Sequence, residues 1–236
     1  MKDVCCIIPA RLDSKRFPKK IMADLLGKSL LERVYLAAKS CPFEELWVAV
    51  DSQEIFDLAR SFGANAVMTS KTAKSGTDRI GEVVKRLDIK QKIIVNWQCD
   101  EPFIHKKMIE DLLSGEGDVW TLKKKIEDQK EILSPHTVKV VTDLKGNALY
   151  FSRSPIPHHA DTYYKHIGLY AYRADVLAQI TTWAPTPLEK TESLEQLRFL
   201  ENGLVIRVNK TKFESIGIDT IEDLKRAQKR LVDNLQ

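Results

Sequence analysis

Two clusters of charged residues in this sequence have the types and spacing that phosphate chemistry needs. The first is a basic segment from Arg11 to Lys20, which contains Ser14. Arginine forks bind phosphate in a bidentate way and lysines add point charge, so this segment could hold a polyanion such as a triphosphate. A solvated loop is the alternative for any run of charges. The five cations of the segment are Arg11, Lys15, Arg16, Lys19 and Lys20.

The second cluster is acidic and comes from two distant parts of the chain. Asp100 and Glu101 closely follow an apolar run at 93–95, and Asp219 follows the apolar residues 216–218. Carboxylate oxygens suit Mg²⁺, which keeps several waters and bridges substrate phosphates. Helix capping is the alternative role for Asp219 alone. A carboxylate that follows a buried strand must be solvated, paired or bound to metal.

The first half of the chain alternates apolar runs with segments of helical periodicity. This order is typical of a parallel sheet covered on both faces, in which ligands bind beyond the carboxyl ends of the strands. Pro9 is expected to end the first strand, and Asp51 to cap the second helix. The expected strands are 4–8, 46–50, 67–68 and 92–97, and the expected helices follow Ser29 and Asp51 or cover 77–87.

The second half has a different rhythm. We expect a single domain over 1–236, with a nucleotide-binding core at about 1–115 and 174–236 and a β-rich elaboration at about 116–173. The expected elements are a hairpin of strands 138–142 and 148–152, a strand at 164–172, a helix at 189–201, a strand at 205–208 and a terminal helix capped by Thr220.

Length and composition exclude several classes of protein. With 236 residues, of which 43% are hydrophobic, the chain can bury a real core. A formal net charge of +4 is too small for a dedicated nucleic-acid binder. No apolar run is long enough for a membrane span or a signal peptide, and the four cysteines lack zinc or disulfide spacing. We therefore expect a cytoplasmic protein with reduced thiols.

The usual nucleotide fingerprints are absent, but other motifs identify a family. Neither G-x-G-x-x-G nor G-x-x-x-x-G-K-[ST] is present, so phosphate must be held by another device. The motifs, taken in order, resemble those of the 3-deoxy-manno-octulosonate (Kdo) cytidylyltransferases over nearly the whole chain. They include Ile7-Ile-Pro-Ala-Arg11, Ser75-Gly-Thr-Asp-Arg79, Gln98-Cys-Asp-Glu-Pro102, Ala148-Leu-Tyr-Phe-Ser-Arg-Ser154, Leu194-Glu-Gln-Leu-Arg198 and Gly217-Ile-Asp-Thr220.

The resemblance implies a fold and a reaction. The fold is a three-layer αβα sandwich of the nucleotide-diphospho-sugar transferase type, with a mostly parallel, mixed sheet. In the reaction, the anomeric hydroxyl of Kdo attacks the α-phosphate of CTP, pyrophosphate leaves, and CMP-Kdo forms for lipopolysaccharide assembly. The implied partners are CTP and this acidic eight-carbon sugar, with Mg²⁺ as cofactor and a homodimer as the assembly.

The resemblance also assigns roles to individual residues. Arg11, Lys20, Asp100 and Asp219 are the expected catalytic residues, and the two aspartates are the expected metal ligands. The expected CTP-binding residues are Ala10, Arg11, Ser14, Arg16, Lys20, Ser75, Gly76 and Arg79. The expected sugar-binding residues are Gln98, Arg153, His166, Glu195 and Gln196, with Arg153 on the sugar carboxylate because its fork suits that group.

Several positions depart from the family pattern, Lys19 and Asp78 among them, and two that precede Asp100 leave the substrate open. Cys99 stands where the family usually has glycine, and Trp97 replaces a smaller apolar residue. A side chain at Cys99 narrows the site beside the attacking hydroxyl. A modified Kdo such as the 8-amino form, or a nonulosonate, is therefore an alternative sugar. From another class, a non-catalytic nucleotide-binding or interaction protein is the remaining alternative.

Overall fold

The structure, a computed structural model, describes residues 1–14, 16–73 and 75–233, so Lys15 lies outside the described residues. The chain divides into two compact units. The first unit contains Met1–Lys106 and the segment from Ser215 onward, and the second unit contains Lys107–Glu214. The second unit includes the whole elaboration expected at 116–173, together with residues 174–214.

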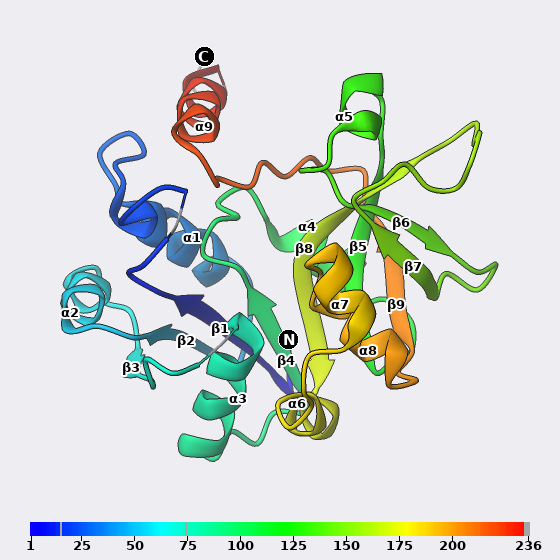
Figure 1. The fold of residues 1–236 in the computed structure, drawn as a ribbon. Coiled ribbons are helices and arrows are strands. Elements are labelled where there is room, and N and C mark those ends of the chain that lie inside the picture. The colour runs from blue at the N-terminus through cyan, green and yellow to red at the C-terminus, as the bar shows by residue number, and fades with distance from the viewer. Residues whose placement is uncertain (15, 74, 234–236) are drawn as a thin grey trace. The chain divides into compact units, whose positions relative to one another are not determined.

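Four parallel strands form the sheet of the first unit, in the order β3-β2-β1-β4 (Figure 1). The chain moves from β1 to β2 on one side and later returns to β4 on the other. This reversal is the kind of switch point at which α/β sheets bind ligands, beyond the carboxyl ends of the strands. The strands are β1 Val4–Ala10, β2 Glu45–Val50, β3 Ala66–Met68 and β4 Ile93–Trp97.

Helices α1, α2 and α3 pack against this sheet. Because crossovers between parallel strands are right-handed, α1 and α2 cover one face and α3 the other. Ser29 caps α1 by accepting a hydrogen bond from Glu32 N at 3.1 Å, as the sequence predicts. The helical elements of this unit are η1 Lys20–Met22, α1 Leu30–Lys39, α2 Gln53–Ser61, α3 Gly76–Arg86 and α9 Ile221–Asp233.

Two local predictions for this unit were wrong. Pro9 does not end β1, which continues to Ala10. The pairing of β1 with β4 stops at Ile7, so the missing N–H of Pro9 falls where β1 has a single neighbour, β2. The cap of α2 is Ser52, which accepts from Ile55 N at 3.3 Å, and Asp51 is left for another role.

The second unit is built around β5, a strand that the sequence pattern did not reveal. β5 Val119–Lys125 pairs with β8 Tyr164–Arg173 in antiparallel and with β9 Ile206–Lys210 in parallel. The predicted hairpin is confirmed as β6 Lys139–Thr142 and β7 Ala148–Ser152. The helices of this unit are α4 Lys106–Leu112, α5 Gln129–Leu133, α6 Ala174–Ile180, α7 Pro187–Glu192 and α8 Gln196–Glu201.

The single helix predicted at 189–201 was wrong, because the chain breaks it between α7 and α8. Ser193 adopts the left-handed conformation with φ of 54°, which ends α7 and leaves its last carbonyl groups without partners from a following helical turn. The site described below shows what those carbonyl groups bind.

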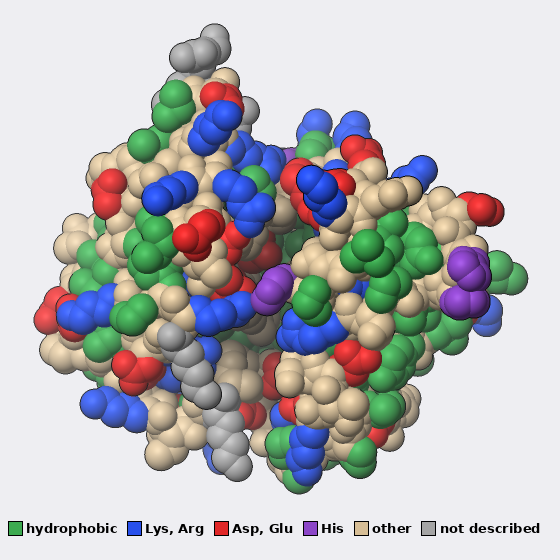
Figure 2. Space-filling view, turned by 45° about the horizontal axis from the view of Figure 1, so that its top comes forward, with side chains coloured by type: hydrophobic (Ala, Val, Ile, Leu, Met, Phe, Trp, Pro, Cys, Tyr) green, Lys and Arg blue, Asp and Glu red, His purple; other side chains and the backbone are tan. Residues whose placement is uncertain are grey.

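On the face shown in Figure 2, basic and acidic side chains are interspersed rather than gathered into one basic surface. Within the described residues, no helix combines the length and the apolar character that crossing a membrane requires.

Candidate active site

The first unit contains a cleft of about 510 Å³ at the switch point between β1 and β4. The loops after these strands, the start of α3 and the segment before α9 border it. Of the predicted residues in this unit, Ala10 does not line the cleft because it is the fully buried end of β1. Those that do line it are Arg11, Ser14, Arg16, Lys20, Ser75, Gly76, Arg79, Gln98, Asp100 and Asp219.

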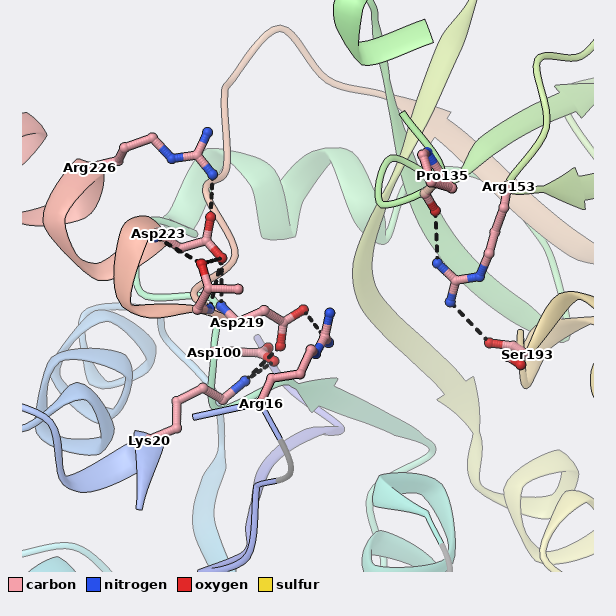
Figure 3. A network of polar contacts seen from close by, with 10 residues as sticks. Arg16, Lys20, Asp100, Pro135, Arg153, Ser193, Asp219, Asp223 and Arg226 are labelled. Atoms are coloured by element: carbon pink, nitrogen blue, oxygen red, sulfur yellow. Dashed lines mark hydrogen bonds and ion pairs between the residues drawn. The ribbon is translucent and has the colours of Figure 1, made fainter. Parts of the chain in front are cut away.

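The two predicted metal ligands meet at one lysine. Lys20 Nζ lies 2.8 Å from Asp100 Oδ2 and 2.9 Å from Asp219 Oδ1 (Figure 3). Burial alone would lower the pKa of Lys20, but the two carboxylates outweigh it and raise that pKa above its ordinary value. Residues 100 and 219 are far apart in the sequence, and the fold brings their carboxylates to within reach of a single small cation.

Arg16 adds a second positive group to one of these carboxylates, since its Nη2 lies 2.8 Å from Asp219 Oδ2 (Figure 3). Not every cation of the basic segment faces the cleft. Lys19 turns to Glu54 of α2 at 2.7 Å instead. The capping role considered for Asp219 is taken by Thr220, whose hydroxyl accepts from Asp223 N at 3.2 Å.

The donor set of Asp100 and Asp219 fits a hard divalent cation. Both groups offer carboxylate oxygens, which Mg²⁺ prefers. Within the described residues, no cluster of three or more His, Cys, Asp or Glu side chains could hold a metal. A divalent ion on this pair would therefore take its other ligands from water and from substrate phosphates, as Mg²⁺ commonly does.

The start of α3 forms another side of the cleft. Ser75 caps this helix by accepting from Asp78 N at 3.1 Å, and Gly76 is its first residue. A Cβ at Gly76 would lie 3.4 Å from both the Gln98 side chain and Pro9, so glycine lets the backbone come close to these groups. The free N–H groups at a helix start favour anions. The start of α3 therefore offers a place for an anion in the cleft.

Asp51 is a cleft-supporting residue that the sequence reasoning missed. Its Oδ1 accepts from Leu12 N at 3.1 Å, and its Oδ2 lies 3.3 Å from Arg79 Nη2. Burial lowers the pKa of Arg79, whereas Asp51 acts in the opposite direction. Asp51 therefore ties the basic segment after β1 to α3. The signal in the sequence is weak, because an aspartate just before a helix usually indicates a cap.

Replacing Asp51 with asparagine is expected to raise the KM for the expected nucleotide about tenfold, the equivalent of one lost hydrogen bond to a charged group. The reason is that Leu12 and Arg79 lose the charge that holds them. We also expect the free energy of unfolding to fall by about 2 kcal/mol. Steady-state kinetics and urea unfolding measure the two effects. Asp57→Asn, on the exposed face of α2, is the control; a stability loss with an unchanged KM would contradict the expectation.

Cys99 and Trp97, which depart from the family pattern, have different positions. Cys99 lines the cleft between Gln98 and Asp100. Burial raises the pKa of its thiol above the usual range, which keeps it protonated. Trp97 is fully buried, does not line the cleft, and donates from Nε1 to Glu101 O at 3.0 Å. Burial raises the pKa of Glu101 to about 8, with a further contribution from Asp100.

The other predicted sugar-binding residues lie in the second unit. Arg153 Nε donates to Glu192 O at 2.8 Å, Nη1 to Pro135 O at 3.0 Å and Nη2 to Ser193 O at 3.3 Å (Figure 3). The Glu192 and Ser193 carbonyl groups are the ones that the end of α7 leaves without partners in a following helical turn. The guanidinium has five N–H groups, so one remains on each terminal nitrogen to bind a ligand. Gln196 is buried at the start of α8, and Glu195 directly precedes it.

His166 is a neutral side chain in this unit. Its Nε2 lies 2.9 Å from Thr121 Oγ1, whose own proton is donated to Leu169 O at 2.9 Å. The hydroxyl therefore accepts from Nε2–H, which leaves Nδ1 as an acceptor. Burial lowers the pKa of His166 to about 3. His166 can thus hydrogen-bond a sugar hydroxyl, but it does not supply a positive charge at neutral pH.

The low pKa of His166 predicts how stability depends on pH. The folded chain binds this proton less readily than the unfolded chain, whose histidine has an ordinary pKa near 6.5. Stability is therefore complete above pH 6.5 and falls between pH 6.5 and 3 by about 1.4 kcal/mol for each pH unit. Urea unfolding should show that wild type loses about 2 kcal/mol more than His166→Gln between pH 6.5 and 5. His136→Gln, at an exposed position, should follow wild type; equal losses in all three would refute the assignment.

A switch-point cleft that combines cations with two converging carboxylates defines a nucleotide-binding α/β protein. A family model described as Cytidylyltransferase matches residues 5–216. The chain is 45% identical to a 3-deoxy-manno-octulosonate cytidylyltransferase of Geobacter metallireducens over 97% of both chains. It belongs to the cytidylyltransferase family and, within it, to the 3-deoxy-manno-octulosonate cytidylyltransferases.

Solved structures agree with this membership. The structure of a CMP:2-keto-3-deoxy-manno-octonic acid synthetase complexed with CTP matches with a TM-score of 0.92 and 37% identity, over 98% of this chain and 99% of the other. A glucose-1-phosphate thymidylyltransferase from Bacillus anthracis, described as putative, matches with a TM-score of 0.70 and 15% identity, over 98% and 96%. The first likeness confirms the expected fold, a mixed, mostly parallel sheet flanked by helices, and the second likeness shows the fold alone.

Proposed function

We propose that this chain transfers CMP from CTP to the anomeric hydroxyl of Kdo, an acidic eight-carbon sugar. Pyrophosphate leaves, and the product CMP-Kdo serves lipopolysaccharide assembly. The observation that carries the proposal is the convergence of Lys20, Asp100 and Asp219 in a cation-rich cleft at the switch point of the sheet. Membership of the Kdo cytidylyltransferases supplies the identity of the nucleotide and the sugar.

The residues of the cleft would act mainly by positioning and by neutralising charge, which is what nucleotidyl transfer demands. Ser75 and Gly76 would receive the ribose and the pyrimidine, since backbone groups at Gly76 can approach the base closely. The groups on the triphosphate would be Arg11, Ser14, Arg16, Lys20 and Arg79, which share one cleft.

We propose Mg²⁺ as the cofactor, with Asp100 and Asp219 as its protein ligands. When bound, it would offset the charge that develops at the α-phosphate and favour ionisation of the attacking hydroxyl. Lys20 pairs with one oxygen of each carboxylate, so a bound ion would compete with it for this pair. Arg16 would orient Asp219 from the other oxygen.

Each unit carries residues that we propose for the sugar. Gln98 lines the cleft, and its side chain is held in place by Asn96, because Gln98 Nε2 donates to Asn96 Oδ1 at 2.7 Å. We assign Arg153 to the sugar carboxylate, because its two remaining N–H groups suit a bidentate contact. His166, Glu195 and Gln196 would serve the sugar hydroxyls.

Pyrophosphate release from each of the four nucleoside triphosphates, with Kdo and with or without Mg²⁺, tests the proposal. Release should require CTP, Kdo and Mg²⁺ together. The panel should include 8-amino-Kdo and a nonulosonate, because Cys99 lines the cleft beside Gln98. Release with one of these sugars but not with Kdo would change the substrate. Nucleotide binding without release on any sugar would favour a non-catalytic binding protein.

We further propose that the enzyme works as a homodimer in the cytoplasm, where CTP is available. Exposed leucines on and beside the β6–β7 hairpin, Leu144 and Leu149, offer apolar surface for a second copy. Light scattering during gel filtration measures the oligomeric state. A monomer at micromolar concentration would reject the dimer.

A further inference from the structure

Glu101 is a carboxyl group beside the cleft for which the proposed mechanism has no task. It directly follows Asp100, but its side chain does not line the cleft. It meets the segment 215–219 instead. Ser215 Oγ donates to Glu101 Oε2, and a Cβ on Gly217 would lie only 3.3 Å from Glu101 Oε1. The carboxyl group therefore packs against this segment behind the metal-binding face.

Backbone and indole groups reinforce the same junction. Ile218 N donates to Asp100 O at 2.9 Å, and Trp97 Nε1 donates to Glu101 O at 3.0 Å. Glu101 N in turn donates to Gln98 O at 3.1 Å, which closes the loop after β4 into a turn. Trp97 is wholly buried in the sheet, so it gives this turn a rigid anchor.

Both proposed metal ligands are attached directly to this junction. Asp100 precedes Glu101 in the chain, and Asp219 follows Ile218, the residue bound to Asp100 O. A shift of segment 215–219 away from the turn would therefore separate the two carboxylates that now meet at Lys20. Partners behind metal ligands commonly fix their orientation, and their loss costs about 10- to 100-fold in metal affinity or activity.

We propose that Glu101 is a positioning residue, which holds segment 215–219 against the turn after β4 so that Asp100 and Asp219 can bind one divalent ion. This inference rests on the proposed function. Glu101 does this through its size and its hydrogen bond with Ser215. It is not a third ligand, because its side chain is occupied on the far side of the turn and does not reach the cleft.

The test is the binding of Mn²⁺, measured by electron paramagnetic resonance with and without CTP, on wild type and four variants. Glu101→Ala should weaken Mn²⁺ binding about tenfold, and Glu101→Gln should restore it, because the amide keeps the size and can accept from Ser215. Ser215→Ala should weaken binding by a smaller factor and serves if Glu101→Ala does not fold. Glu45→Ala is the matched control, since Glu45 holds Trp47 and Gln91 at the amino end of β2.

The outcomes separate this inference from the proposed function. If wild type itself binds no Mn²⁺ and releases no pyrophosphate, the proposed function fails. If wild type binds Mn²⁺ and the Glu101→Ala protein binds it equally well, the positioning role is refuted while the function stands. Equal weakening in Glu101→Gln and Glu101→Ala would also refute it, since the charge rather than the packing would then matter. If Glu45→Ala weakened Mn²⁺ binding as much as Glu101→Ala, the effect would reflect general destabilisation of the fold, and the positioning role would be refuted.

Discussion

Replacing Asp100 with asparagine is expected to lower kcat about 10³-fold while the chain folds as before. Asparagine keeps the shape and one oxygen of the side chain but removes its charge. The ion pair with Lys20 at 2.8 Å and one of the two carboxylates of the proposed metal site are lost together. Lys20 still has Asp219 at 2.9 Å, so the free energy of unfolding should change by less than about 1 kcal/mol.

Pyrophosphate release at saturating CTP and Kdo measures the loss, and thermal unfolding checks the fold. Asp57→Asn removes the same charge from the exposed face of α2 and should keep wild-type turnover. Retention of more than a tenth of the wild-type kcat by Asp100→Asn would mean that Asp100 is not a ligand in the reaction. An unfolded Asp100→Asn protein would mean that the carboxylate is needed for stability instead.

The site in the first unit was accessible from sequence because its residues sit at strand ends. An apolar strand followed by charge can be recognised locally, and the parallel order of the sheet then brings the ends of β1 and β4 to one edge. Asp219 shows the same local pattern, an acid directly after an apolar run, which allowed it to be paired with Asp100 although it lies 199 positions from Lys20. The contact of Asp51 with Arg79 was not predicted. An aspartate just before a helix has the same local sequence pattern whether it caps the helix or binds an arginine elsewhere.

The second unit was harder to predict because tertiary contacts override its local patterns. β5 carries Thr121 and three lysines at 123–125, a composition typical of a solvated segment. Thr121 and Lys123 are nevertheless buried. Lys123 is covered by Tyr164 of β8, whose ring centroid lies 4.8 Å from Nζ. The break at Ser193 has no glycine or proline to mark it. It is explained by Arg153, which binds the carbonyl groups at the end of α7.

Replacing Lys20 with methionine is expected to have two opposite effects. The kcat/KM for CTP should fall about 10³-fold, because a buried cation that lines the proposed triphosphate site is lost. At the same time, the nucleotide-free protein should bind Mn²⁺ more tightly, by about tenfold. The Lys20 ammonium group pairs with one oxygen of Asp100 and one oxygen of Asp219. Without it, Mn²⁺ no longer competes with a lysine for these two carboxylates.

This combination distinguishes Lys20 from a residue that only stabilises the fold. A structural lysine would lose activity and metal binding together, because the two carboxylates would separate when their shared partner disappears. Titration of Mn²⁺ by electron paramagnetic resonance on the nucleotide-free protein gives the second quantity independently of turnover. Lys20→Arg keeps the charge and should hold Mn²⁺ affinity near the wild-type value. Weaker Mn²⁺ binding by Lys20→Met would show that Lys20 assembles the carboxylate pair rather than competing for it.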